Sequence, residues 1–206
     1  MLLGLAPLRI SFAGGGTDLE EYHNKYEGFT ISATINKFTY VFARYRNDNK
    51  IQSFSPDFAS HLAPKTMDKI KSSQGHEIVL TCIREMKFKN GLDIFFCSDV
   101  EPGSGLGASS SMATNFVQVL LKLQNQKWDK NKIAMKAYSI GHDVLKWGIG
   151  KQDEFASCYG GINLYKFTKK KVDLTPVSLK KNTLKELQNN SLLFHMGSRG
   201  HSAKVL

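Results

Sequence analysis

Apolar and polar residues alternate along several segments of this chain, and a period of two predicts β-strands. The longest such segment covers residues 29–45, which we expect to form a long strand or a pair of strands. A short apolar strand with one embedded arginine, Arg9, precedes the first glycine cluster. Further strands are predicted over three segments: residues 92–97, 162–167 and 191–194.

Other segments repeat their apolar residues every three or four positions, which predicts helices. The clearest one places its large apolar side chains on one face: Met112, Phe116, Val119, Leu120 and Leu123. Further helices are predicted over four segments: residues 19–22, 67–71, 77–87 and 132–146. Because helices and strands do not alternate strictly along the chain, the pattern favours an α+β fold.

The composition is that of an enzyme-sized globular domain. The chain has 206 residues, 41% of them hydrophobic, which suffices for one good-sized core or one core and part of a second. Cys82, Cys97 and Cys158 lie far apart and form no C-x-x-C pair, so we expect reduced thiols in a cytoplasmic protein. No apolar run reaches the length of a signal peptide or a membrane span, and we expect neither.

The formal net charge is +10, and the lysines are spread along the whole chain. The tightest cluster, residues 169–171, falls at a predicted hairpin turn. Nucleic-acid binding would require the charge to gather on one face with aromatic partners. We therefore interpret the charge as a solvated basic surface that serves anionic ligands, and expect no nucleic-acid partner.

A glycine-rich turn at residues 101–111, Glu-Pro-Gly-Ser-Gly-Leu-Gly-Ala-Ser-Ser-Ser, runs directly into the clearest predicted helix. Its glycines let backbone N–H groups converge on one point, and the helix N-terminus adds the positive end of its dipole. The serine hydroxyls can cap the helix or reach a metal ion or a phosphate oxygen. The turn lacks the Lys-Ser or Lys-Thr pair of a Walker loop. It predicts a phosphate cradle, with an ordinary helix cap as the alternative, formed by Gly103, Ser104, Gly105, Leu106, Gly107, Ala108, Ser109 and Ser110.

Two further motifs accompany this turn. Residues 6–19 read Ala-Pro-Leu-Arg-Ile-Ser-Phe-Ala-Gly-Gly-Gly-Thr-Asp-Leu, and residues 150–155 read Gly-Lys-Gln-Asp-Glu-Phe in a predicted loop before Tyr-Gly-Gly at 159–161. The order and spacing of the three motifs resemble the GHMP kinase superfamily, named for galactokinase, homoserine kinase, mevalonate kinase and phosphomevalonate kinase. The residues of the first and third motifs are most similar to those of the D-glycero-D-manno-heptose 7-phosphate kinase branch. The resemblance extends through nearly all of the chain.

The resemblance implies a ribosomal-protein-S5-like N-terminal domain, here residues 1–175, and the start of a truncated C-terminal domain at residues 176–206. In the family, the nucleotide and the sugar meet in a cleft between the two domains, and ATP and Mg²⁺ are the cofactors. Such kinases are usually longer and carry a third glycine-rich motif late in the sequence, which we do not find here. The resemblance therefore implies either a fragment or a naturally shortened form.

Two residues are the candidates for catalysis. Phosphoryl transfer to a hydroxyl requires alignment, charge neutralisation and a base for the hydroxyl proton. The resemblance assigns the base to Asp153 of Gly-Lys-Gln-Asp, although an aspartate in such a loop is often a turn former or a cap. Arg9 is expected beside it, where it polarises the attacking oxygen; a salt bridge at a strand edge is the alternative.

The first glycine motif is the candidate sugar site. A carboxylate such as Asp18 can accept hydrogen bonds from two neighbouring hydroxyls, and it can equally cap the short helix that follows. The three glycines leave room for a substrate against the backbone. Other branches of the family carry larger polar residues at two of these positions, which touch the sugar, so the resemblance implies an acceptor bulkier than galactose. The predicted substrate-binding set is Gly14, Gly15, Gly16, Thr17, Asp18, Gly160 and Gly161.

For magnesium, Ser109 or Ser110 would supply a hydroxyl ligand. The family commonly adds a carboxylate from the helix before the catalytic loop, roughly where Gly141 and His142 stand in this sequence. Asp143 is the nearest acid, and its direction is left open because one helical position rotates a side chain by about 100 degrees. For adenine the sequence is less informative: Phe54 and Phe58 could line a base pocket, but we expect them in the core.

The sequence thus predicts an ATP-dependent kinase that phosphorylates a hydroxyl, by resemblance the anomeric one, of a heptose phosphate. Arg199 is a candidate donor to the substrate phosphate, or a solvated residue at a helix entry. An L-fucose or galactose kinase and a catalytically silent sugar- or nucleotide-binding module are the alternatives. A homodimer is left open, and no membrane partner is expected.

Overall fold

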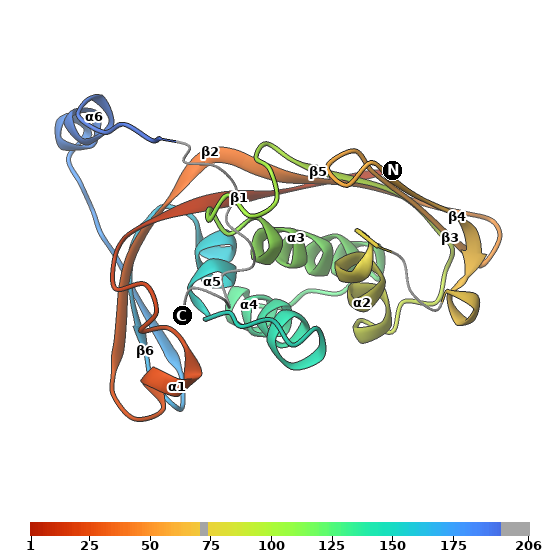
Figure 1. Cartoon of the computed structure of the whole chain (residues 1–206), viewed down its shortest axis with the longest axis horizontal. Coiled ribbons are helices and arrows are strands. Elements are labelled where there is room, and N and C mark those ends of the chain that lie inside the picture. Colours follow the sequence, from red (N-terminus) through yellow and green to blue (C-terminus); the bar gives the residue numbers. More distant parts are fainter. Residues whose placement is uncertain (71–73, 195–206) are drawn as a thin grey trace.

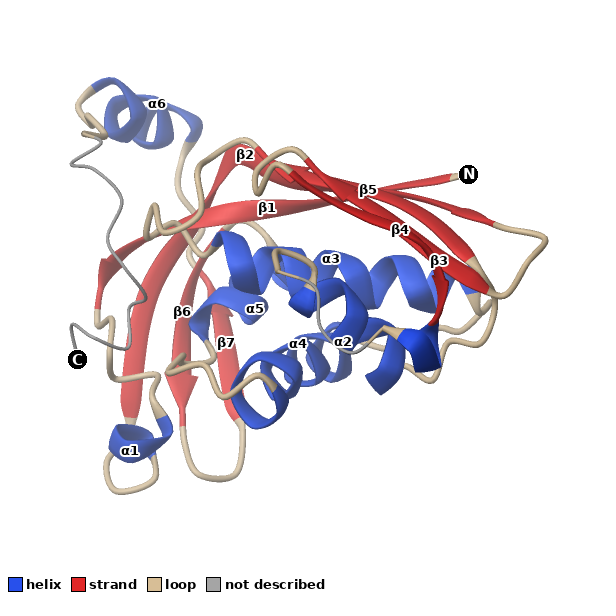
Figure 2. Ribbon diagram, turned by 45° about the vertical axis from the view of Figure 1, so that its right-hand side comes forward, coloured by secondary structure: helices blue, strands red, loops and turns tan. Residues whose placement is uncertain are grey.

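The computed structural model describes residues 1–70 and 74–194. A curved sheet carries its helices on the concave face (Figure 1), and the same arrangement is clear after rotation (Figure 2). The strands are β1 (Leu2–Ala13), β2 (Gly28–Tyr45), β3 (Lys50–Ser55), β4 (Ser60–Thr66), β5 (Leu92–Ser98), β6 (Ile162–Phe167) and β7 (Val172–Pro176). The helices are α1 (Glu20–His23), the 3₁₀ helix η1 (Met67–Lys69), α2 (Glu77–Glu85), α3 (Ala108–Leu123), α4 (Lys130–Ser139), the π-helix η2 (Ile140–Val144), α5 (Gln152–Tyr159) and α6 (Lys181–Asn189).

The long strand β2 organises the sheet. One edge of β2 pairs antiparallel with β1, and the opposite edge is shared between two partners. Its residues 28–33 pair with β6, and its residues 39–45 pair with β5. The sheet continues from β5 to β3 and β4 and from β6 to β7, and the β3–β5 pair is its parallel pairing. This mixed topology confirms the predicted α+β class.

Helix α3 lies at the centre of the helical layer, packed on β1 and β2 and covered by α2, α4 and α5. The sequence predicts an apolar stripe, yet every residue from 110 to 121 except Gln118 is buried. The polar members of this run bind the sheet. The Asn115 side-chain amide donates to the carbonyls of Gly4 at 3.1 Å and Thr39 at 2.9 Å, and the Ser111 hydroxyl donates to the Ala6 carbonyl at 3.1 Å. These bonds fix the start of α3 against β1.

Several predicted elements differ in the structure. The predicted helix 132–146 begins earlier, because the Asp129 carboxylate caps it at the Lys132 N–H, and it ends in the π-helix η2. The strand predicted at 191–194 is wrong, since this segment has no regular structure. Strands β3, β4 and β7 and helix α6 were not predicted. Of the helix predicted at 67–71, η1 covers the first part, and residue 71 lies outside the described residues.

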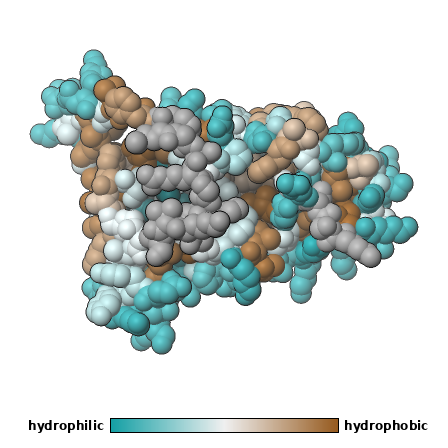
Figure 3. Space-filling view, viewed as in Figure 1, coloured by the Kyte–Doolittle hydropathy of each residue, from teal (hydrophilic) through white to brown (hydrophobic). Residues whose placement is uncertain are grey.

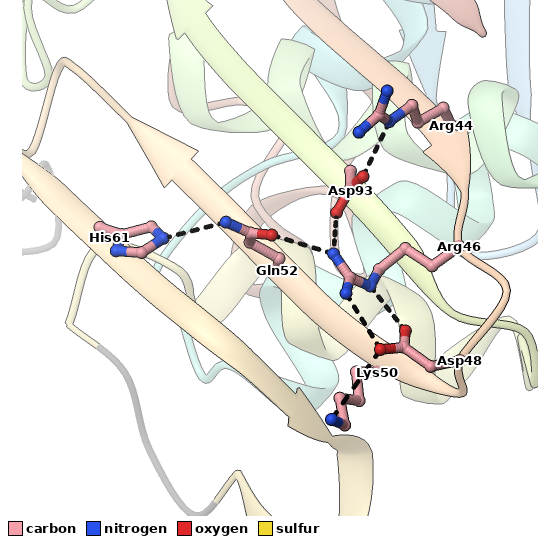
Figure 4. A network of polar contacts seen from close by, with 7 residues as sticks. All are labelled: Arg44, Arg46, Asp48, Lys50, Gln52, His61 and Asp93. Atoms are coloured by element: carbon pink, nitrogen blue, oxygen red, sulfur yellow. Dashed lines mark hydrogen bonds and ion pairs between the residues drawn. The ribbon is translucent and has the colours of Figure 1, made fainter.

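A network of charged side chains fixes the turn between β2 and β3 (Figure 4). Arg46 donates to both carboxylate oxygens of Asp48, at 2.7 and 3.0 Å, and also to Gln52 and to Asp93 of β5. The guanidinium of Arg46 lowers the pKa of Asp48 to about 2. A planar donor fork suits such a bidentate carboxylate. Because this network joins β2, β3 and β5, we assign it to the sheet and not to a ligand site.

Helix α6 lies apart from the helical layer (Figure 1), and none of its residues is buried. Figure 3 shows hydrophilic residues at this end of the molecule and hydrophobic residues beside β2. The predicted domain boundary between residues 175 and 176 falls at the end of β7 and stays a prediction. The three cysteines are free thiols. Among the described residues, no helix has the length and apolar character needed to cross a membrane.

Candidate active site

The three sequence motifs meet in one cleft of about 440 Å³, although they lie far apart along the chain. The cleft opens where β1, the first glycine loop, the phosphate loop (residues 101–107) and the segment before α5 converge. Its lining residues are Arg9, Ile10, Ser11, Gly15, Gly16, Asp18, Leu19, Gly105, Leu106, Gly148, Ile149, Gly150, Gln152, Asp153 and Leu193. The cleft is therefore the candidate active site.

The phosphate loop is held against β1 and ends in an open helix N-terminus. The Arg9 N–H donates to the Leu106 carbonyl at 3.2 Å. Gly107 is the N-cap residue of α3 with φ of 75°, a left-handed conformation that favours glycine, and no side chain caps the helix. The structure therefore contradicts a serine cap, which is part of the alternative interpretation. Without a side-chain cap among the described residues, the start of α3 has the form of helix N-termini that bind anions, and the phosphate cradle stays a prediction.

Arg9 and Asp153 form an ion pair beside the phosphate loop. Arg9 Nε and Nη2 donate to the two carboxylate oxygens of Asp153 at 2.6 and 2.7 Å, and Arg9 Nη1 donates to the Gly105 carbonyl at 2.8 Å. A register shift between Pro7 and Arg9 interrupts the β1–β2 ladder, and such irregularities re-aim a side chain. The structure thus brings the two predicted catalytic residues together.

Asp153 lies in the first turn of α5 and not in a loop, which corrects the sequence prediction. Its carboxylate also faces α3. A Cβ added at Gly107 would lie 2.9 Å from Asp153 Oδ2, so the glycine is required there for contact as well as for conformation. The starts of two helices therefore converge on one carboxylate.

Asp18 is buried and bridges the first glycine loop and the start of α5. Its Oδ1 accepts from the Gly16 N–H and its Oδ2 from the Gln152 N–H, both at 3.1 Å. Burial raises the pKa of Asp18, while the bond from Gln152 opposes the rise. A Cβ at Gly150 would lie 2.0 Å from Asp18 Oδ2, so this approach requires glycine. Asp18 does not cap α1, whose N-cap residue is Leu19.

The other predicted substrate residues divide into two groups. Gly15 and Gly16 line the cleft with Asp18. Four residues do not line it and have structural contacts or open surroundings instead: Gly14, Thr17, Gly160 and Gly161. For example, the Thr17 hydroxyl donates to the Gly14 carbonyl at 2.8 Å and accepts from the Phe29 N–H at 2.9 Å.

Sequence reasoning missed several polar residues around the cleft. The Ser11 hydroxyl donates to the Gln152 side-chain oxygen at 2.8 Å, and both residues line the cleft. Lys151 is buried, and its ammonium lies 3.1 Å from the Glu20 carboxylate and over the Tyr138 ring. Lys151 and Gln152 belong to the sequence motif that contains Asp153, and this position in the motif could have identified them as residues around the cleft.

The residues around the start of α3 fit a magnesium ion in part. Ser110 is buried, whereas Ser109 is exposed. Asp143 lies in η2 with a side chain that is 62% exposed, accepts a hydrogen bond from His142, and does not line the cleft. The described residues contain no group of three acidic, histidine or cysteine side chains that could hold a metal. Glu154 supplies an orphaned buried carboxyl, since neither of its oxygens has a hydrogen-bond partner among the described residues.

The remaining candidates lie elsewhere. Phe54 and Phe58 are exposed, so the core position expected for them is wrong. Phe54 stacks on Phe95 and lines a separate hollow with it, away from the phosphate loop. Arg199 lies outside the described residues.

Residues 76–161, which contain the phosphate loop and Asp153, match the family of GHMP kinases N terminal domain. This similarity covers the phosphate loop and α5 and less than half of the chain. It is 30% identical to the D-glycero-alpha-D-manno-heptose 7-phosphate kinase of Campylobacter jejuni over 91% of this chain and 57% of the relative. The chain thus spans less than two thirds of that kinase.

Solved structures are also similar to this chain. A D-glycero-D-manno-heptose 1-phosphate kinase from Bacteroides thetaiotaomicron is 27% identical with a TM-score of 0.84, over 91% of this chain and 63% of that one. A galactokinase from Lactococcus lactis shares the fold, at 22% identity and a TM-score of 0.72, over 86% of this chain and 47% of that one.

Proposed function

We propose that this chain forms the nucleotide-binding and catalytic part of an ATP-dependent sugar kinase. The proposed acceptor is a heptose phosphate, phosphorylated on its anomeric hydroxyl. One observation carries the proposal: the Asp153 carboxylate lies in the cleft, bound by Arg9, at the end of the phosphate loop. The printed names of the two heptose phosphate kinases support the choice of acceptor.

The geometry supports an in-line transfer assisted by a base. The sugar hydroxyl attacks the γ-phosphorus of ATP, its proton passes to the Asp153 carboxylate, and the bond from the γ-phosphorus to the bridging oxygen breaks to release ADP. Arg9 orients that carboxylate through two hydrogen bonds. A third hydrogen bond, from Arg9 to the Gly105 carbonyl, holds the base in a fixed position relative to the phosphate loop. Proton acceptor and phosphate site are thereby positioned by the same side chain.

Magnesium, when bound, would neutralise charge on the nucleotide phosphates. Ser109 or Ser110, both in the first turn of α3 after the phosphate loop, would supply a hydroxyl to hold it. Everything else in the proposed step rests on residues of the chain itself.

The acceptor sugar would bind between the first glycine loop and the segment before α5. Asp18 lines the cleft, and each of its oxygens accepts one backbone bond, which leaves a second lone pair for a sugar hydroxyl. Gly15 offers open space there, since a Cβ added to it would meet its nearest neighbour at 3.9 Å. This space lets a substrate lie against the backbone of the loop.

The acceptor phosphate would need further cationic partners. Arg9 is the only cation among the described residues that line the cleft, and it is already paired with Asp153. The buried Lys151 is paired with Glu20. We therefore propose that backbone N–H groups, or residues outside the described ranges, bind the acceptor phosphate.

The test is ADP release from the 206-residue chain with four acceptors: heptose 7-phosphate, the unphosphorylated heptose, galactose and L-fucose. If the acceptor phosphate is recognised, the specificity constant for heptose 7-phosphate should exceed that for the unphosphorylated heptose by about 10-fold to 150-fold, which corresponds to one charged hydrogen bond. A preference for galactose or fucose would refute the proposed acceptor. ATP binding without turnover on any acceptor would refute the kinase activity and indicate a binding module.

A further inference from the structure

Gln152 directly precedes the candidate base, and its side chain takes no part in the proposed transfer. It lines the cleft, although only 4% of the residue is exposed. Among the described residues its side chain has one hydrogen bond, in which Oε1 accepts from the Ser11 hydroxyl at 2.8 Å. A glutamine amide carries two N–H donors in addition to its oxygen. The Nε2 donors of Gln152 are therefore available to a ligand in the cleft.

Two polar bridges join β1 to the first turn of α5. In one bridge Arg9 binds Asp153, and in the other Ser11 binds Gln152. The β1–β2 ladder is regular from Arg9 to Ser11, so these two side chains share one face of the strand, with about 7 Å between their backbone positions. All four residues line the cleft. The second bridge therefore lies beside the candidate base, along the same wall of the cleft.

The open space at Gly15 lies next to this second bridge. A Cβ added to Gly15 would have Ser11 Oγ as its nearest neighbour, at 3.9 Å. An acceptor that lies against this glycine loop would therefore face the Ser11 and Gln152 side chains. The main chain of Gln152 is also fixed, because its N–H donates to Asp18 Oδ2 at 3.1 Å. An amide held at both ends is preorganised, which lowers the entropy that a ligand loses on binding to it.

We propose that Gln152, oriented by Ser11, determines acceptor specificity by donating a hydrogen bond to the C2 hydroxyl of the sugar. This inference rests on the proposed function, in which the anomeric hydroxyl faces Asp153. The ring neighbours of an anomeric carbon are the ring oxygen and C2, so the C2 hydroxyl is the one closest to the reacting hydroxyl. Gln152 is next to Asp153 in the first turn of α5 and offers its N–H donors at this position.

The experiment measures the binding of heptose 7-phosphate and of its 2-deoxy analogue by isothermal titration calorimetry, without nucleotide. Wild type should bind heptose 7-phosphate about 3-fold to 10-fold more tightly than the 2-deoxy analogue, which corresponds to one neutral hydrogen bond. Gln152→Met keeps the length of the side chain and removes its donors, so the Kd values of this variant for the two sugars should agree within 2-fold. A residue with a purely structural role would weaken both sugars equally and leave the preference unchanged.

Two further variants complete the test. Ser11→Ala removes the group that orients the amide and should reduce the preference for the C2 hydroxyl, and it decides the question if Gln152→Met does not fold. Gln124→Met is the matched control, because Gln124 Nε2 donates to the Met86 carbonyl at 3.0 Å. This control should lower the melting temperature and keep the wild-type preference.

The inference and the proposed function fail in different ways. If wild type binds the two sugars equally, or if Gln152→Met or Ser11→Ala keeps the full wild-type preference, the inference is overturned and the proposed function stands. If wild type does not bind heptose 7-phosphate, the proposed acceptor is wrong and the inference fails with it.

Discussion

Replacing Asp153 by asparagine tests the centre of the proposed mechanism, because the change removes the basic oxygen while keeping the size of the side chain. The asparagine can still accept one hydrogen bond from Arg9 through its single oxygen. Its amide group, however, presents N–H donors to the second guanidinium N–H, where the carboxylate now accepts at 2.7 Å. The variant should therefore lose both a proton acceptor and one charged bond.

The two losses have different magnitudes. One charge-assisted bond contributes about 1.5–3 kcal/mol to the free energy of unfolding, and the side chains of Arg9 and Asp153 are only 13% and 21% exposed, so little of this is screened. For a chain of this size the melting temperature should fall by roughly 3–12 °C. Loss of the base should lower turnover about 100-fold to 10,000-fold, equivalent to about 2.7–5.4 kcal/mol in the barrier.

The assays are thermal unfolding and ADP release with heptose 7-phosphate, while ADP affinity is followed separately and should not change. Asp173→Asn is the matched control, because Asp173 pairs with Lys171 at 2.8 Å on an exposed hairpin, and surface pairs contribute at most about 1 kcal/mol. Turnover within a few-fold of wild type would remove Asp153 from its role as base. An unchanged melting temperature would refute the stabilising role assigned to its pairing with Arg9.

Two further predictions concern the loops and the sheet. Gly150→Ala should lower the melting temperature and abolish sugar binding in a ligand titration, because the added Cβ would lie 2.0 Å from Asp18 Oδ2. The control Gly15→Ala should leave the melting temperature nearly unchanged. Equal melting temperatures for the two variants would contradict this prediction. His76 is buried between Ser53 and Ser60, and burial lowers its pKa, so the unfolded chain takes up the proton more readily. The contribution of His76 to the free energy of unfolding should therefore be fully present above about pH 6.5 and be lost as the pH falls below it. In urea unfolding, the free energy of unfolding should fall less between pH 7.5 and pH 5.5 for His76→Gln than for wild type.

Motifs with strong local signals were predictable from the sequence. The glycine-rich turn before α3 requires left-handed backbone at Gly107, a conformation that glycine adopts without the steric cost of a side chain. The strands β5 and β6 and the body of α3 carry periodic apolar residues, whose pattern reflects burial on a defined face. Features of this kind depend on residues within one short segment and not on contacts with distant parts of the chain.

Other features depend on partners far along the chain. The segment 191–194 has strand-like composition but pairs with no strand in the described part of the chain, while β3 and β4 form strands because β5 provides an edge. The pairing of Arg9 with Asp153 spans 144 positions, and the family resemblance, not the local pattern, indicated it.

The sequence by itself determined the glycine loops, the strongest helices and strands, and the residue types available for phosphoryl transfer. Only the tertiary structure decided which of these residues meet. It places Asp153 on a helix instead of a loop, buries the Glu154 carboxyl with no hydrogen-bond partner among residues 1–70 and 74–194, and leaves Asp143 exposed. Burial and long-range contact depend on how whole elements pack, and identical short segments acquire different surroundings when their neighbours change.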